Sequence, residues 1–445
     1  MDEDQRSVTK RAFLTAVSTA VGAGCLATSE SENDHNEVPP DENRSEPDLE
    51  PDREFDPKSE PDEPESESDE PTLFLDNDSR GILWDNGRQW QSGERFDEWE
   101  VLAGSAEIST SRVYRGWQSV HMTAAGDGRT AVRIPLDGFD LTKTSFSVAM
   151  YIETPGPQIG PSFDVNAPAC DAQLHFRTRH KIDKPGWIRY DLGISHTSAL
   201  ESTKESYMTI SWTGNVDWYL ADIRAVPVEE EPRLFIQFDD SLRTTYETAF
   251  PIMREYGIEA TVFTITGREG YSSHLTLSQM EEMQDAGWEF GSHTHTHRRT
   301  GELPLDEQRT ELEHSKEWLL DHGFTQAAST LAYPFGSFTT ATMDIAAEYY
   351  DFATHVQYGA MNRTINSPLS VNRHLGDTPE KVRELIDLLL DERIPTDTLV
   401  LCYHDVVEGH NNWISPSEFR ESMAYINESG VQCLLTSNLR DHQFE

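Results

Sequence analysis

A short apolar run that ends in two carboxylates, Leu234-Phe-Ile-Gln-Phe-Asp239-Asp240-Ser241, constrains the fold of this chain more than any other stretch. Four of its first five residues are apolar, which is typical of a strand that is buried on both faces. Two adjacent acids are costly inside a core, but they fit the C-terminal mouth of a parallel strand, where α/β folds place their chemistry. The alternative is that the Asp pair only begins the next helix, because Asp is a good N-cap.

The sequence after Pro232 alternates between strand and helix patterns. Helices are predicted at Arg243–Tyr256, after the capping box that begins at Thr276, and at about Leu305–His322. Further strands are predicted near Ala260, Trp288, Leu331, Phe352, Leu369, Leu399 and Val431. About eight strands in about 215 residues predict an α/β fold, a small and irregular (β/α) barrel over residues 228–445.

Residues 72–227 have a different pattern, with short alternating runs between turn residues and no helical period. The runs begin at Trp99, Ser119, Ala131, Ser145, Trp187, Met208 and Trp218. This pattern predicts an all-β sandwich. The run that begins at Trp218 resembles the last strand of jelly-roll modules that accompany carbohydrate enzymes, so we interpret 72–227 as similar to a carbohydrate-binding module. Its tryptophans either bind glycan or belong to the core; the candidates are Trp84, Trp90, Trp99, Trp117 and Trp187.

Residues 1–28 are typical of an export signal rather than of a folded element. Lys10-Arg11 precedes a small apolar run and resembles a twin-arginine signal with Lys10 in place of one arginine. Ala23-Gly24-Cys25 resembles a lipoprotein box, in which Cys25 would carry the lipid; the alternative is a cleaved signal with an incidental cysteine. Residues 29–71 are rich in Glu, Asp, Ser and Pro, and we expect a disordered acidic linker.

The composition is strongly acidic, with 79 Asp and Glu against 36 Lys and Arg and a formal net charge of −43. Such a chain repels phosphates, so we expect no nucleic-acid partner. Acidic, lysine-poor surfaces are typical of proteins from salt-loving archaea, where salt screens the self-repulsion. The four cysteines are too few for a disulfide scaffold. Cys402 and Cys433 lie on the last two predicted strands, which are neighbours if the barrel order is sequential. We expect free thiols there rather than a disulfide.

Histidines follow two further predicted strands. His293-Thr-His295-Thr-His297 comes directly after the strand at Trp288, and His404 ends the apolar run at Leu399. Neutral imidazoles are common zinc ligands, and i, i+4 spacing would place His293 and His297 on one side of a helical turn. In an extended segment His293 and His295 would share a face instead. The alternatives are a solvated polar loop and, for His404, a core histidine.

Taken together, these motifs resemble the polysaccharide deacetylases, the NodB-homology family also called carbohydrate esterase family 4. Phe238-Asp239-Asp240-Ser241 is similar to the family's Phe-Asp-Asp-Gly, and His293-Thr-x-x-His297 to its His-Ser/Thr-x-x-His. Ala332-Tyr-Pro-Phe-Gly336 is similar to the third motif, in which many members have Arg at the position of Ala332. Leu401-x-x-His404 lies where the last motif supplies Leu-x-His, and no Asp-x-x-Asp-Trp motif is visible.

The resemblance implies a site at the barrel mouth. Asp240, His293 and His297 would hold one divalent metal ion, with zinc the expected ion, Asp239 would act as general base and His404 as general acid. The turn that contains Tyr333 and Phe335 would contact the substrate, with the Phe335 N–H stabilising the oxyanion.

The arginine of the third motif is missing, since Ala332 stands in its place, and the base Asp239 still needs a positive partner. Arg373, at another predicted strand end, is our candidate for an ion pair with Asp239; the alternative is a solvated rim residue.

The sequence thus predicts an exported, lipid-anchored monomer that removes N-acetyl groups from a surface or extracellular polysaccharide with a divalent metal ion. The alternatives are an O-acetyl esterase acting on a glycan and a catalytically silent glycan-binding protein.

Overall fold

The computed structural model describes residues 96–441 apart from 115–117, 127, 137, 154–159, 178–184, 201–203, 215, 229–230, 357–364, 366 and 410–412. The predicted signal, the acidic linker and Cys25 lie outside the described residues, as do Trp84, Trp90 and Trp117. None of the helices in the described part of the chain combines the length and the apolar character that a membrane span requires.

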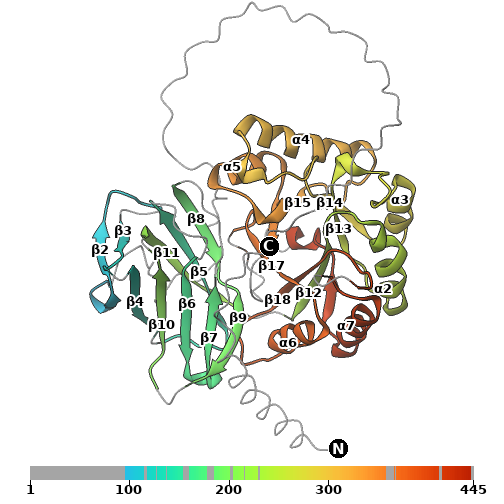
Figure 1. The fold of residues 1–445 in the computed structure, drawn as a ribbon. Coiled ribbons are helices and arrows are strands. Elements are labelled where there is room, and N and C mark those ends of the chain that lie inside the picture. Colours follow the sequence, from blue (N-terminus) through green and yellow to red (C-terminus); the bar gives the residue numbers. More distant parts are fainter. Residues whose placement is uncertain are drawn as a thin grey trace, which may run out of the picture. The chain divides into compact units, whose positions relative to one another are not determined.

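The first described part is all β and contains two antiparallel sheets (Figure 1). The six-stranded sheet has the order β1 (Glu100–Ala103), β4 (Arg129–Pro135), β10 (Tyr207–Thr213), β6 (Ser162–Ala167), β7 (Ala172–Arg177) and β9 (Ile194–Ala199). The five-stranded sheet has the order β2 (Ser105–Ser109), β3 (Ser119–Thr123), β11 (Asp217–Pro227), β5 (Thr144–Ile152) and β8 (Gly186–Asp191).

Alternating side chains bring the two sheets together. In β10 the residues Met208, Ile210 and Trp212 are buried, and their neighbours along the strand are more exposed. The ring of Trp212 meets that of Trp218 in β11 with centroids 5.3 Å apart, so the inner faces of the sheets share one core. Trp99 is also buried, which agrees with a core role for this candidate.

The second part is a barrel of parallel strands. Its strands are β12 (Arg233–Phe238), β13 (Thr261–Thr264), β14 (Glu289–Ser292), β15 (Thr330–Ala332), β16 (Phe352–Val356), β17 (Val371–Leu375) and β18 (Thr398–Tyr403). Each pairs with the next, and β12 pairs with both β13 and β18, which closes the ring. An eighth strand, β19 (Gln432–Leu434), pairs with the first half of β12. The predicted irregular (β/α) barrel is therefore present.

Helices surround the barrel strands (Figure 1). They are a π-helical turn (Thr245–Ala249), α2 (Phe250–Tyr256), α3 (Leu277–Asp285), α4 (Leu305–Asp321), α5 (Thr340–Tyr349), α6 (Pro379–Leu389) and α7 (Pro416–Ser429). The short α8 (Asn438–Asp441) follows β19, and its Leu439 packs against Phe235, Val371 and Val400 of the strands. The capping box at Thr276 is confirmed, because its side chain accepts from Gln279 N and the Gln279 side chain accepts from Thr276 N.

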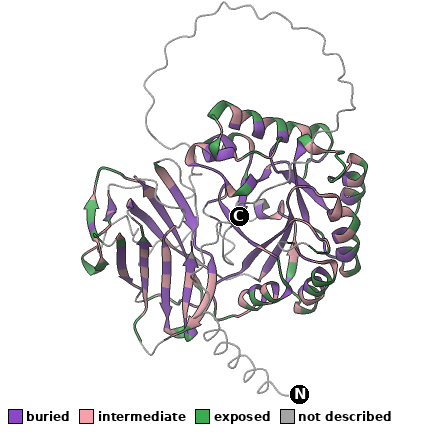
Figure 2. Cartoon of the chain, viewed as in Figure 1, coloured by how far each residue is buried: buried purple, intermediate pink, exposed green. Residues whose placement is uncertain are grey.

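The barrel core lies between strands and helices, so strands are buried while helices are exposed on their outer sides (Figure 2). All six residues of β12 are buried, as expected for a central parallel strand. One prediction about this region is wrong: the strands of Cys402 and Cys433 are not neighbours. The first strand of the barrel, β12, returns between them, with Gln237 opposite Cys402 and Leu234 opposite Cys433.

Candidate active site

Two carboxylates project from the end of β12, where the backbone makes an unusual turn. Asp239 continues the strand, and its N–H donates to Tyr403 O at 2.9 Å. Asp240 and Ser241 then adopt left-handed conformations, with φ of 67° and 50°. Glycine adopts this region without steric cost, whereas a serine does not. This explains why the related motif has glycine at the position of Ser241.

The two ligand-candidate histidines come together through a loop and not through a helix. Thr294 and His297 both have φ of 63°, and the side chain of Thr294 accepts from His297 N at 3.1 Å. The segment is therefore not the helical turn that the i, i+4 spacing predicts. His293 and His297 nevertheless lie side by side, with ring centroids 4.8 Å apart. His295 contacts Thr266 Oγ1 at 3.0 Å and lies outside this group.

One potential metal-binding group consists of Asp240, His293 and His297, whose ligand atoms all lie within 4.8 Å of one another. Asp240 Oδ1 is 3.5 Å from His293 Nε2 and 3.1 Å from His297 Nε2. This oxygen is buried and makes no hydrogen bond within the described part of the chain. Two imidazoles and one carboxylate are the donor types that zinc prefers, so the residues fit such an ion.

A backbone contact sets the orientation of His293. Its Nδ1 lies 2.7 Å from the carbonyl oxygen of Ala332, so Nδ1 carries a proton and Nε2 is left as the ligand atom. Burial lowers the pKa of His297. Burial raises the pKa of Asp240, but the two adjacent histidines outweigh this and hold that pKa well below its usual value. Asp240 therefore stays anionic.

Asp239 forms a buried ion pair with Arg373. Nη1 donates to Oδ1 at 2.9 Å and Nη2 donates to Oδ2 at 2.5 Å, and the two side chains are 1% and 3% exposed. The predicted contact is therefore present, supplied from β17. Burial raises the pKa of Asp239. The charge of Arg373 has the larger opposing effect and His293 and His404 add to it, so the pKa of Asp239 lies below its usual value.

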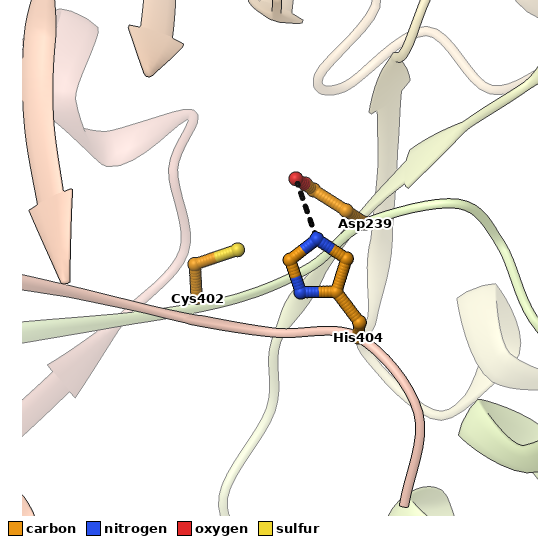
Figure 3. Close-up of side chains that lie close together, drawn as sticks. All are labelled: Asp239, Cys402 and His404. Atoms are coloured by element: carbon orange, nitrogen blue, oxygen red, sulfur yellow. Dashed lines mark ion pairs between the residues drawn. The ribbon is translucent and has the colours of Figure 1, made fainter. Parts of the chain in front are cut away.

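A second group joins Asp239, Cys402 and His404 (Figure 3). His404 Nε2 lies 3.8 Å from Asp239 Oδ2. Both oxygens of Asp239 already bond to Arg373, whose positive charge disfavours a metal cation here. Burial raises the pKa of Cys402 well above its usual value, so it remains a neutral thiol. This group is therefore better suited to proton transfer than to metal binding.

No partner for His404 is predicted from the sequence, and the structure supplies one. The ring of Trp413 lies 5.0 Å from the imidazole, in the segment between β18 and α7. Trp413 was missed because it follows a polar loop and belongs to no apolar period. An aromatic residue shortly after a strand-end histidine was the available signal.

The turn after β15 presents Phe335 to solvent. Phe335 is left-handed, with φ of 56°, and is 55% exposed. Its ring lies 4.6 Å from that of His297 and 4.4 Å from the guanidinium carbon of Arg299. Tyr333 is buried instead, and its hydroxyl donates to Leu369 O, so its side chain packs in the interior rather than at the mouth.

Comparisons with known proteins agree with this geometry. The family model described as polysaccharide deacetylase matches residues 228–350. The barrel carries a polysaccharide deacetylase domain. The matched residues include the two carboxylates, the histidine loop and the turn at Phe335, whereas Arg373 and His404 lie beyond them.

Several relatives share this deacetylase domain. YxkH of Bacillus subtilis (strain 168), whose name assigns it provisionally to the polysaccharide deacetylases, is 34% identical over 134 residues, which is 30% of this chain and 48% of that protein. A poly-β-1,6-N-acetyl-D-glucosamine N-deacetylase of Staphylococcus aureus (strain MSSA476) is 34% identical over 116 residues, 23% of this chain and 40% of that protein. The chain thus spans less than half the length of each of these relatives.

Among solved structures, the Streptococcus pyogenes deacetylase PplD in complex with acetate has 34% sequence identity. That likeness covers 32% of this chain and 62% of the PplD chain, with a TM-score of 0.30.

Proposed function

We propose that this protein is a metal-dependent deacetylase that hydrolyses N-acetyl groups of a surface or extracellular polysaccharide. The observation that carries the proposal is the convergence of Asp240, His293 and His297 beside an arginine-paired Asp239. The family match and the N-deacetylase relative support the reaction and the substrate class. A silent site is disfavoured, because Arg373 supplies the charge that Ala332 lacks.

Asp240, His293 and His297 would hold one divalent ion, with zinc the expected ion. The ion supplies Lewis acidity, which polarises an acetyl carbonyl and makes water more acidic. Every other role falls to side chains and backbone of the chain. The donor atoms come from the ends of two strands, and backbone contacts position both ends.

Asp239 is the general base. Its Oδ2 faces His293 and His404, with 3.8 Å to the Nε2 atom of each, and accepts the proton of the attacking water. Arg373 keeps the carboxylate ionised and fixes its plane through two hydrogen bonds. His404, with its side chain 22% exposed, is reachable by substrate and donates a proton from Nε2 to the leaving amine. The left-handed turn at Phe335 presents its N–H to the oxyanion.

The test is acetate release from a panel of N-acetylated and O-acetylated oligosaccharides, with and without a chelator and with zinc added back. We expect release from N-acetylated glycans that stops with chelator, and Asp239→Asn should abolish it while metal is retained. Release from O-acetylated glycans alone would favour the esterase alternative. No release from any member of the panel by the zinc-loaded wild type would reject the proposal.

We further propose that the protein is exported, acts as a monomer and is held at the outer face of the membrane by lipid on Cys25. The Ala23-Gly24-Cys25 sequence supports the anchor. Mass spectrometry of the mature N-terminus tests it, since a first residue downstream of Cys25 in protein recovered from the medium would exclude lipidation.

A further inference from the structure

The guanidinium of Arg373 has a second acceptor besides Asp239. Nη1 also donates to Gln237 Oε1 at 3.1 Å, and Gln237 is fully buried in β12, two residues before the base. Because arginine donates but cannot accept, the amide must turn its oxygen towards Arg373. Its nitrogen Nε2 then donates to Thr436 Oγ1, also at 3.1 Å.

Thr436 is itself fixed by the barrel. It follows β19, and its N–H donates to Thr261 Oγ1 at 3.1 Å at the start of β13. Thr261 Oγ1 donates in turn to Glu289 Oε1 at 2.7 Å, and Ser437 N donates to the same oxygen at 2.9 Å. Gln237, Thr436, Thr261 and Glu289 are all buried, so water does not compete for these bonds.

A paired carboxylate and guanidinium hold each other, but the pair can still shift as a unit. Within the described part of the chain Arg373 Nε makes no hydrogen bond, and the ring of Phe263 lies 5.7 Å from the guanidinium carbon. The contact with Gln237 is therefore the polar tie that anchors the pair to β12 and, through Thr436, to the segment after β19.

We propose that Gln237, oriented by Thr436, is a positioning residue that holds Arg373 and thereby the base Asp239 in place. This inference rests on the proposed function, in which Asp239 is the base. If Thr436 orients Gln237, then the segment after β19, almost 200 residues from Gln237 in the sequence, contributes to the turnover rate.

The test compares Gln237→Met and Thr436→Val, each of which removes one side of the tie at similar volume, with the control Thr330→Val. Thr330 is also buried, and its valine variant also loses one hydroxyl hydrogen bond, to Ala327 O, which is not a residue of the candidate active site. We expect kcat to fall about 10-fold in Gln237→Met and about 3-fold in Thr436→Val, because displaced catalytic groups lose rate steeply. KM and metal content should stay unchanged in both variants. Thr436→Ser, which retains the hydroxyl, should have the wild-type kcat, and so should the control Thr330→Val.

A double-mutant cycle separates positioning from general stabilisation. In an Arg373→Met background, Gln237→Met should lower kcat by less than about 2-fold, because the group through which it acts is gone. The thermal unfolding midpoint should show the same non-additivity. Losses that multiply independently, or an equal loss of kcat in Thr330→Val and Thr436→Val, would overturn the proposal.

The unfolding cycle also separates this inference from the proposed function. If the zinc-loaded wild type releases no acetate, the proposed function fails. The midpoints still decide whether Gln237 holds Arg373, and additive midpoint losses would overturn the inference without any reference to substrate.

Discussion

Replacing Arg373 by alanine perturbs the site most directly, because it removes one partner of an enclosed ion pair. Only 1% of Arg373 and 3% of Asp239 is exposed, so the remaining carboxylate would stay in the interior. Loss of one member of such a pair costs about 3–5 kcal/mol of unfolding free energy. The exposed pair of Arg383 and Glu421, at 39% and 51%, contributes less than about 1 kcal/mol, which makes Arg383→Ala the matched control.

The pKa of Asp239 decides how this cost depends on pH. Burial raises it, but Arg373, His293 and His404 outweigh burial and hold it below the usual value. The wild-type carboxylate therefore contributes stability above its unfolded pKa, and this contribution is lost as the pH falls through the folded pKa. Without Arg373 burial dominates and raises the folded pKa, so the variant loses stability as the pH rises through it. The difference between the two proteins should grow from acidic to neutral pH.

The pH dependence of the catalytic rate should show the same rise in the pKa of Asp239. Removing an adjacent arginine should move the acid limb of the rate profile up by about one to three pH units. Within that limb the rate should fall tenfold for each pH unit, since the base must be ionised to accept a proton. Arg373→Lys should lie between wild type and Arg373→Ala, because lysine keeps the charge but loses the two-pronged contact.

The assay combines denaturant unfolding from pH 4 to 8, acetate-release kinetics over the same range and metal analysis of each variant. Metal content should be the same in all of them, since Arg373 is not among the ligand candidates. A stability difference that is independent of pH, or an acid limb at the wild-type position in Arg373→Ala, would refute the reasoning. Arg383→Ala should differ from wild type in neither measurement.

Three further outcomes are expected. Asp240→Ala and His297→Ala should each lose metal and activity while His295→Ala keeps both, as measured by elemental analysis and acetate release; the reverse pattern for the two histidines would contradict the ligand assignment. Cys402 and Cys433 should be alkylated without reductant after denaturation, and a disulfide-linked peptide in the mass spectrum would contradict this. The unfolding midpoint should rise by several degrees between low salt and molar KCl, because the net charge of −43 is self-repelling; a midpoint that is insensitive to salt would argue against adaptation to high salt.

The sequence predicted the elements whose signals are local. The apolar run of β12, the capping box at Thr276 and the length of α4 each depend on neighbours along the chain. Four sandwich strands were not predicted. Of these, β6 and β7 do alternate, with Phe163, Val165, Leu174 and Phe176 buried, so their signal was present.

The missed strands β2 and β9 lie at the edges of their sheets and have few buried residues. An edge strand pairs on one side and covers little of the core, so its sequence needs no clear alternation. Such strands are recognised by their partners in space, which a sequence pattern does not contain.

The contacts that could not be predicted are set by closure of the barrel. Which strand lies between the strands of Cys402 and Cys433 depends on the ring order and not on either segment. The loop that joins His293 to His297 depends on left-handed residues, and Thr294 gives no compositional warning of this because threonine seldom adopts that region. The tie from Gln237 to Thr436 joins two ordinary polar residues that become significant only as neighbours.

The position of Ala332 shows how the barrel could exchange one arginine for another. Its backbone carbonyl orients His293, and this contact does not depend on which side chain the residue carries. The arginine that many family members have at this position would have a different role, which is to give the carboxylate of the base a positive partner. Because parallel strands of a closed barrel all end at one mouth, that charge can come from a different strand, and β17 supplies it through Arg373. A buried guanidinium beside Asp239 leaves no reason for a second one, which would be repelled at short range. With Arg373 paired to Asp239, this chain needs no arginine at position 332.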